Sequence, residues 1–316
     1  MNLILLFSGQ GLQSGRHVEE VMNGISNDEQ SLLKTVIPEL FANDDSDGSD
    51  GVFNNETMFN TETMFNNKTA QPFIYALQYH RWQQLRALID KPSAFAGYSL
   101  GEINAFCCSA QLDFEAGLRL VHKRATLMED EVSESSGLLS VQGLHGSELE
   151  NLLLDTDTHL SIKIGEDQFI IGGHKDNLIQ AEQLVKTLGA RSTKLLKVSV
   201  PSHTKMMQSA AEKFHTHIDA MTSPVMQIPI ISATEGIKYY NAAQGLNILS
   251  GQIDHPLDWY ACMETIQEYQ PSMIIEIGPG NALSKMINNL MPHLPCRSWD
   301  DFRHIDGLLE WIAKNR

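Results

Sequence analysis

The sequence contains few basic residues, few cysteines and no long apolar run. Its 316 residues include 23 Lys and Arg against 39 Asp and Glu, which leaves a formal net charge of −16. A chain this acidic offers no general positive field to a nucleic-acid backbone or an anionic membrane. We therefore expect neither nucleic acid nor a membrane among its partners.

The apolar stretch nearest the start, residues 3–7, has no basic lead-in and is far shorter than the roughly 18 residues that a membrane span requires. This absence predicts a cytoplasmic protein. The four cysteines form neither a CxxC pair nor a dense framework. We therefore expect reduced, mostly buried thiols, and neither disulfides nor a metal site.

What the sequence does contain is enough apolar material for sizeable cores. Hydrophobic residues make up 42% of the chain, and its length favours two structural units. Apolar runs at residues 2–7, 93–97, 227–233 and 272–277 alternate with helical patterns at residues 72–88, 100–110, 114–131, 205–220 and 259–269. The alternation predicts an α/β fold, with a mostly parallel sheet covered by helices as in an α/β-hydrolase-like core.

The order of predicted strands and helices is different between about residue 133 and residue 198. The pattern predicts, in order, a strand at 138–141, a helix at 147–154, strands at 160–164 and 169–171, a helix at 178–188 and a strand at 192–198. This order is ferredoxin-like. We therefore predict an inserted ferredoxin-like small domain at residues 133–198, and a large α/β catalytic domain made of residues 1–132 and 199–316.

The sequence Gly97-Tyr98-Ser99-Leu100-Gly101 fits the nucleophile-elbow pattern, in which glycines let a strand turn sharply into a helix and expose a serine hydroxyl. Ser99 would then lie at a helix N-terminus, where the amide of Leu100 could stabilise a developing oxyanion. An ordinary glycine-rich turn is the alternative interpretation. The predicted strand before the motif and helix after it favour the catalytic one.

A serine nucleophile needs a base, and His203 is the strongest candidate among twelve histidines. It follows a predicted strand and precedes a predicted helix. Position alone favours an exposed loop histidine that caps the next helix. Its combination with other motifs favours the general base.

Five ordered motifs make the chain similar to the malonyl-CoA:acyl-carrier-protein transacylases. The resemblance covers nearly the whole chain, including the predicted insert. The motifs are Phe7-Ser8-Gly9-Gln10-Gly11, Gly97-Tyr98-Ser99-Leu100-Gly101-Glu102, Leu120-Val121-His122-Lys123-Arg124, Val198-Ser199-Val200-Pro201-Ser202-His203 and Glu276-Ile277-Gly278-Pro279-Gly280.

The resemblance implies that Ser99 becomes acylated and that His203 is its base. It also implies that the backbone amides of Gln10 and Leu100 are the oxyanion donors, and that the backbone carbonyl of Gln252 orients the histidine in place of an acidic residue. Malonyl-CoA would be the substrate and an acyl carrier protein the partner, with no permanently bound cofactor.

The same resemblance makes Arg124 the residue that holds the acyl carboxylate. A guanidinium offers a planar two-point donor that a lysine lacks. A solvated charge on an amphipathic helix is the alternative interpretation, but Val121 and Met128 indicate that this helix face is partly buried. We include Met128 among the expected substrate-binding residues.

The chain departs from the family pattern at Ser8, where proline is usual, and at Tyr98, where histidine is most common. Both are expected in the pocket wall, where they would affect acyl specificity.

The tail from Cys296 to Arg303, with Gly307 and Trp311, resembles the epsilon subunit of bacterial malonate decarboxylase. We therefore predict a malonyl transferase of that branch. The alternatives are a fatty-acid or polyketide malonyl transacylase, an acyl-thioester hydrolase on the same scaffold and a catalytically idle scaffold subunit.

Two further charged segments need an interpretation. Residues 43–54 begin like a calcium loop but have Asn54 where the closing glutamate should be, so an acidic surface loop is expected. Basic residues concentrate near His203 in this acidic chain, and they could either balance charge or receive an acidic carrier protein. They are Arg191, Lys194, Lys197 and Lys205.

Overall fold

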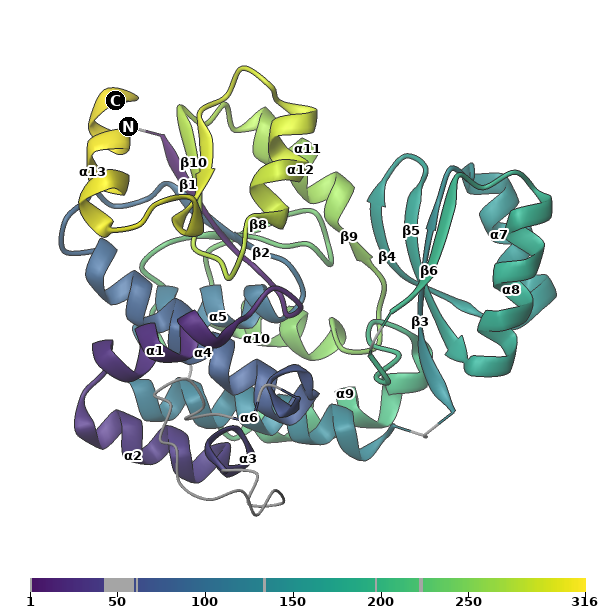
Figure 1. Cartoon of the computed structure of the whole chain (residues 1–316), viewed down its shortest axis with the longest axis horizontal. Coiled ribbons are helices and arrows are strands. Elements are labelled where there is room, and N and C mark those ends of the chain that lie inside the picture. The colour runs from purple at the N-terminus through teal and green to yellow at the C-terminus, as the bar shows by residue number, and fades with distance from the viewer. Residues whose placement is uncertain (1, 43–59, 61, 133–134, 197, 222–223) are drawn as a thin grey trace, which may run out of the picture.

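The computed structural model describes residues 2–42, 60, 62–132, 135–196, 198–221 and 224–316. Two sheets flanked by helices form an α/β fold (Figure 1). The predicted acidic loop at residues 43–54 lies outside the described residues. Among those described, no helix combines the length and the apolar character needed to cross a bilayer.

The first sheet has six strands and is mostly parallel. Its strands, in spatial order, are β11 (Cys296–Ser298), β10 (Met273–Glu276), β1 (Leu3–Phe7), β2 (Ala94–Gly97), β7 (Ile230–Ile231) and β8 (Lys238–Tyr239). Only the pairing of β7 with β8 is antiparallel. The mostly parallel sheet predicted from the sequence is therefore present.

The central strand β1 is an unbroken apolar run because both of its faces are covered. Every residue from Leu3 to Phe7 is fully buried. Leu3, Leu5 and Phe7 belong to one core, and Ile4 and Leu6 belong to a second core on the other face. This is the pattern expected of a parallel strand between two helical layers.

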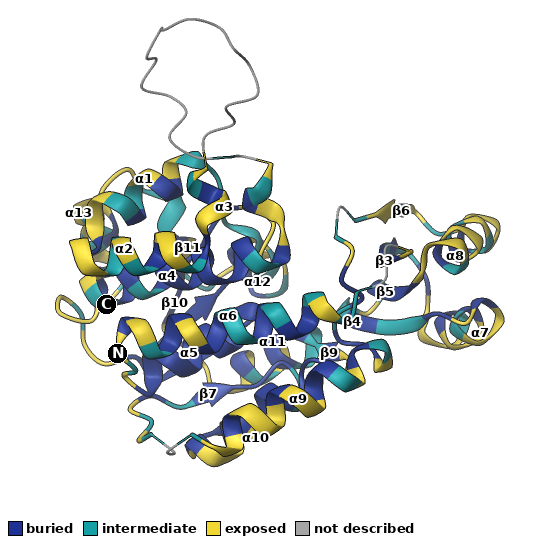
Figure 2. Ribbon diagram, turned by 90° about the horizontal axis from the view of Figure 1, so that it is seen from below, coloured by how far each residue is buried: buried dark blue, intermediate teal, exposed yellow. Residues whose placement is uncertain are grey.

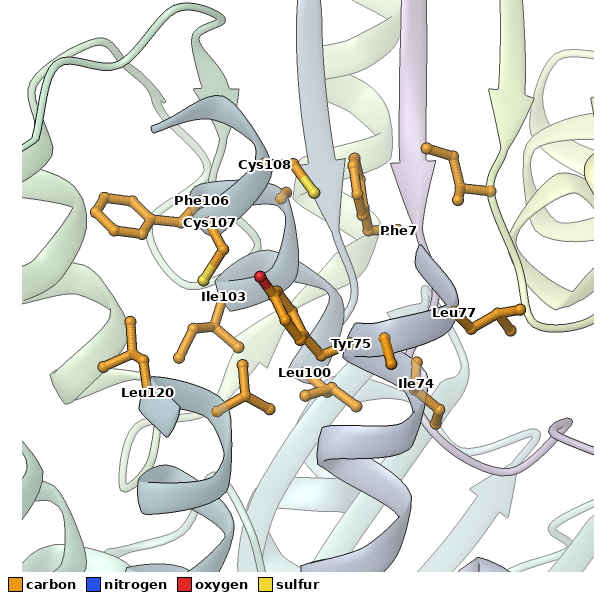
Figure 3. Packing of buried hydrophobic residues seen from close by; sticks show 14 of the residues in the cluster. Phe7, Ile74, Tyr75, Leu77, Leu100, Ile103, Phe106, Cys107, Cys108 and Leu120 are labelled. Carbon is orange, nitrogen blue, oxygen red and sulfur yellow. The ribbon is translucent and has the colours of Figure 1, made fainter. Parts of the chain in front are cut away.

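More helices cover one face of the first sheet than the other. Side chains of α1, α2, α4, α5, α6, α9, α10 and α13 join the core that contains Phe7, and those of α11 and α12 join the other. Figure 3 shows Phe7 in one cluster with side chains of α4, α5 and α6. These helices are α1 (Gly15–Gly24), α2 (Asn27–Val36), α4 (Asn67–Leu85), α5 (Leu100–Ser109), α6 (Phe114–Asp130), α9 (Gln208–Asp219), α10 (Ala242–Gly251), α11 (Trp259–Glu268), α12 (Ala282–Leu290) and α13 (Ile305–Lys314).

Four short helices complete this part of the chain. They are α3 (Pro38–Phe41) and the 3₁₀ turns η1 (Thr63–Phe65), η2 (Lys205–Met207) and η3 (Trp299–Asp301). Figure 2 shows that the helices over the sheet turn their buried sides inward and their exposed sides to solvent.

Most strands of the second sheet come from the segment predicted to be an inserted small domain, residues 133–198. Its strand order is β6 (Ser192–Leu195), β3 (Ser136–Gln142), β5 (Gln168–His174), β4 (His159–Gly165) and β9 (Leu257–Asp258). The pairs are antiparallel except for β4 with β9. Helices α7 (Gly146–Thr156) and α8 (Lys175–Thr187) pack on one face of it. Because β9 comes from residues 257–258, the sheet also takes in a strand from beyond the segment 133–198.

Several predicted elements differ in extent from the observed ones. The strand expected at residues 192–198 is β6, which spans Ser192–Leu195. The helix expected to begin at Pro72 already begins at Asn67 and contains the proline. The strand expected at residues 227–233 is limited to Ile230–Ile231. Pro229 has no N–H to give to a sheet, although its carbonyl accepts the amide of Phe95.

Candidate active site

The site forms where two neighbouring parallel strands end. β1 and β2 run in register, with Phe7 opposite Gly97, so the loops that follow them emerge side by side. One loop carries Gln10 and the other carries Ser99. Ligands commonly bind at this edge of parallel sheets, beyond the carboxyl ends of the strands.

Ser99 occupies a sharp turn between β2 and α5. Its φ of 55° and ψ of −115° are uncommon for a residue with a side chain. A Cβ at Gly97 would overlap the backbone of Glu102, and a Cβ at Gly101 would overlap the carbonyl of Phe7. Both flanking glycines are therefore required by close backbone approach, as the elbow pattern implies.

The structure brings Ser99 and His203 together from positions 104 residues apart. The Ser99 Oγ lies 2.7 Å from the Nε2 of His203, and the histidine Nδ1 lies 2.6 Å from the backbone carbonyl of Gln252. A carbonyl only accepts, so Nδ1 carries the proton and donates it there. Nε2 of the neutral ring is then the acceptor for the serine hydroxyl.

His203 is completely buried. Burial, followed by the positive charge of Arg124, lowers the pKa of His203 to about 3, and the hydrogen bond to Gln252 opposes the shift. The imidazole is therefore neutral near pH 7 and its Nε2 is free to accept a proton.

Arg124 projects from α6 and is only 1% exposed. Its Nη1 donates to the side-chain oxygen of Gln71 at 2.7 Å, and its Nη2 donates to that of Gln252 at 3.2 Å. Nε has no hydrogen-bond partner among the described residues. Burial lowers the pKa of Arg124 to about 10, and the charge of Glu102 opposes the shift. Within the described part of the chain, no carboxylate forms an ion pair with this buried guanidinium.

A small cavity connects these groups. Every residue of the predicted site lines it except His203, which is hydrogen-bonded to Ser99, and Gln252, which is hydrogen-bonded to Arg124. Its lining residues are Gln10, Asn67, Gln71, Ser99, Leu100, Arg124, Met128, Val200 and Ser202. The amides of Gln10 and Leu100 are engaged by no hydrogen bond within the described part of the chain, so both N–H groups are available to an oxygen bound beside Ser99.

Sequence reasoning missed three polar residues of this site. Gln71 holds Arg124, and Asn67 in turn accepts from Gln71 at 2.5 Å. Glu102 accepts from the Gln252 side chain at 2.8 Å. Glu102 was visible as the residue after the glycine motif, but Asn67 and Gln71 belong to a helix with no motif of its own.

Two predicted pocket-wall residues lie elsewhere. The ring of Tyr98 packs edge-on against Trp259, with centroids 5.4 Å apart, because residues 98 and 99 point to opposite sides of the strand end. The hydroxyl of Ser8 donates to Glu276 at 2.7 Å. Neither residue lines the cavity, so the expected placement of both was wrong.

The cysteines and possible metal ligands lie apart from this chemistry. All four cysteines are buried free thiols, and burial raises the pKa of Cys107, Cys108, Cys262 and Cys296. No group of three or more His, Cys, Asp or Glu side chains that could hold a metal occurs among the described residues.

Comparison with known proteins places this site in a family. The family described as "Acyl transferase domain" matches residues 19–289. A malonyl CoA-acyl carrier protein transacylase of Bacillus subtilis is 27% identical over 232 residues, which is 71% of this chain and 58% of that protein. The polyketide biosynthesis malonyl CoA-acyl carrier protein transacylase PksC of Bacillus subtilis (strain 168) is 31% identical over 227 residues, 70% of this chain and 77% of that protein.

A solved structure has the same fold along almost the entire chain. It is that of a malonyl-transacylase in complex with its type II PKS acyl-carrier protein, with a TM-score of 0.83, 24% identity and coverage of 98% of this chain and 99% of that one. The match of the family model over residues 19–289 shows that the chain belongs to the acyl transferase domain family.

Proposed function

We propose that this protein moves a malonyl group from malonyl-CoA to the thiol of an acyl carrier protein, through a malonyl ester on Ser99. The observation that carries the proposal is Arg124, a buried guanidinium that opens on the same cavity as Ser99 and whose hydrogen-bond partners among the described residues are amide oxygens. A buried cation without an anion is costly unless a ligand supplies one. The free carboxylate of a malonyl group is such an anion.

In the first half-reaction, His203 takes the Ser99 proton as the hydroxyl oxygen attacks the thioester carbonyl. The oxyanion that forms accepts hydrogen bonds from the amides of Gln10 and Leu100. The C–S bond then breaks, and the coenzyme A thiolate leaves with the proton from His203. In the second half-reaction, the carrier thiol attacks the ester, and the same steps run in reverse order.

The arginine and the histidine act together in this scheme. Because the charge of Arg124 lowers the pKa of His203, pairing of Arg124 with a substrate carboxylate raises that pKa again. The base therefore becomes stronger when the correct acyl group is bound. An acetyl group does not supply this change.

The domain assignment is part of the proposal. Residues 133–198 would form the ferredoxin-like small domain, and residues 1–132 with 199–316 the α/β-hydrolase-like catalytic domain. The element order from β3 to β6 supports this division. The strand β9 from the second segment supports close attachment of the two.

For the pathway, the names of the relatives favour a fatty-acid or polyketide transacylase over a malonate decarboxylase subunit. The tail that resembles the decarboxylase branch has a structural explanation in this chain. Asp300 in that tail accepts from Arg81 at 2.7 Å and lies 3.1 Å from His17. The decarboxylase role stays a second candidate because the tail resembles that branch.

An acidic carrier protein would approach a chain that is itself acidic, so a local positive surface would help. Of the predicted basic cluster, Lys197 lies outside the described residues, and Arg191 is paired with Asp167 at 2.6 Å. Lys194 and Lys205 are exposed and form no ion pair among the described residues. We define Lys194 and Lys205 as the basic rim and propose that it receives the carrier.

Intact-mass measurement after mixing with malonyl-CoA tests the reaction. We expect a malonyl adduct that maps to Ser99, that is absent from Ser99→Ala and that disappears on addition of a holo carrier protein with appearance of the malonyl-carrier. His203→Ala should form the adduct at a rate lower by about 100-fold or more. Loss of the adduct to water without transfer would indicate a thioesterase. No adduct at all would contradict the proposal.

A further inference from the structure

Gln252 holds both functional parts of the site. Its backbone carbonyl accepts from His203, and its side-chain oxygen accepts from Arg124. The residue is completely buried and lies at the C-terminal end of α10, where its own N–H donates to Ile248 at 2.8 Å. The carbonyl is therefore fixed by the helix end, but the side-chain amide needs a separate anchor.

Glu102 is that anchor. Its Oε2 accepts from the Gln252 Nε2 at 2.8 Å and from the amide of Ala233 at 3.3 Å. Glu102 is completely buried in the first turn of α5, and its own N–H donates to the Ser99 carbonyl at 3.0 Å. One helical turn thus carries both the nucleophile and the acceptor that binds Gln252.

These hydrogen bonds run in one direction. Arg124 can only donate. The Glu102 Oε2 faces the Ala233 N–H as well as Gln252, so it is an acceptor toward both. The amide between them must therefore turn its oxygen to Arg124 and its nitrogen to Glu102. If the amide were reversed, its NH₂ would face the guanidinium, donor against donor, and Arg124 would lose one of its two acceptors.

We propose that Glu102 is a positioning residue for acyl selectivity, because it orients the Gln252 side chain that holds Arg124 toward the cavity. This inference rests on the proposed malonyl transfer. It predicts that Glu102 affects recognition of the acyl carboxylate and leaves the Ser99–His203 pair intact, since the Gln252 carbonyl is held independently.

Two variants separate positioning from charge. Glu102→Leu removes the acceptor at similar volume, whereas Glu102→Gln keeps an oxygen for Gln252 and places its NH₂ at Oε1, an atom with no hydrogen-bond partner among the described residues. Glu102→Leu should lower the ratio of malonyl to acetyl kcat/KM about 10-fold, the effect of a lost hydrogen bond to a charged group. Glu102→Gln should restore most of that ratio.

The reactivity of Ser99 toward a fluorophosphonate is the companion measurement, because it needs the catalytic pair but not Arg124. It should change less than about 3-fold in both variants. Glu276→Gln is the matched control. Glu276 is also completely buried but binds the amides of Leu283 and Ser284, so its substitution should leave the malonyl-to-acetyl ratio unchanged.

The double variant Glu102→Leu with Gln252→Leu tests whether one residue acts through the other. Its malonyl-to-acetyl ratio should lie within about 2-fold of the ratio for Gln252→Leu alone. An unchanged ratio in Glu102→Leu, equal losses for both substrates, or additive losses in the double variant would each overturn the inference. Absence of any malonyl adduct in the unsubstituted protein would instead overturn the proposed function.

Discussion

Two arginines of this protein are equally buried and have different surroundings. Arg81 on α4 and Arg124 on α6 are each 1% exposed. Arg81 donates to Glu20 twice at 2.6 Å and to Asp300 at 2.7 Å. Among the residues that the structure describes, Arg124 donates to the amide oxygens of Gln71 and Gln252 and to no carboxylate. One cation is neutralised by the fold itself, and the other is held in place without being neutralised.

The pKa values of the two groups differ accordingly. Burial works to lower the pKa of Arg81, but Glu20 and Asp300 outweigh it and the pKa is raised. For Arg124, burial prevails and the pKa falls to about 10. A buried arginine with carboxylate partners thus has a structural role, because it joins distant segments by ion pairs. A buried arginine with neutral partners beside a cavity is suited to bind an anionic ligand.

The largest expected effect comes from Arg81. Arg81→Met would leave Glu20 without its arginine and would remove one of the two arginines that contact Asp300. Removing one partner of a buried ion pair typically costs about 3–5 kcal/mol of unfolding free energy. Denaturant unfolding should show this loss, and any protein that still folds should keep its malonyl-to-acetyl ratio. A changed ratio with unchanged stability would reverse the roles assigned to the two arginines.

Arg124 should show the opposite behaviour. Arg124→Ala should lower the malonyl-to-acetyl ratio about 10- to 100-fold, because about 1.5–3 kcal/mol of binding to a charged group is lost. Acetyl-CoA use should stay the same or improve. Equal losses for both acyl groups in steady-state kinetics would show that Arg124 is structural.

Gln71→Glu tests the difference between the two arginines directly, because it would give Arg124 a carboxylate partner of the kind that Arg81 has. We expect malonyl acylation to fall about 10-fold as the internal carboxylate competes for the guanidinium. Thermal unfolding should occur at the same temperature or higher. Gln84→Glu, on the same helix but beside His80, is the control and should leave acylation unchanged.

A smaller effect should appear in the pH dependence of Ser99 labelling by a fluorophosphonate. With the pKa of His203 lowered to about 3, the neutral base persists and the rate should stay level down to about pH 5. In Arg124→Ala the nearby positive charge is gone, so protonation becomes easier and the pKa rises. The decrease in rate should then begin at higher pH, and coinciding profiles would argue against this coupling.

The smallest expected effect concerns the basic rim. Reversing Lys194 and Lys205 to Glu should slow transfer to an acidic carrier several-fold at low salt, with less effect at high salt. Formation of the Ser99 adduct should change little. Lys285→Glu, an exposed position on α12, serves as the control. Equal slowing of both half-reactions would place the carrier elsewhere.

Much of the fold could be predicted because its signals are local. The apolar run predicted at residues 2–7 and the helix predicted at residues 114–131 each match the observed element to within a residue or two. The two- and three-residue strands β8, β9 and β11 were missed. Strands this short show no periodicity, and only their neighbours in the sheets define them.

The elbow around Ser99 was determined by the sequence itself, because Gly97 and Gly101 are required by contacts within a few residues and with the adjoining strand. The surroundings of Arg124 were decided only by the tertiary structure. Its partners come from α4 and the end of α10, and Glu102 reaches it through Gln252. No local pattern distinguishes an arginine that will face carboxylates from one that will face amides, since that choice depends on which distant segments pack together.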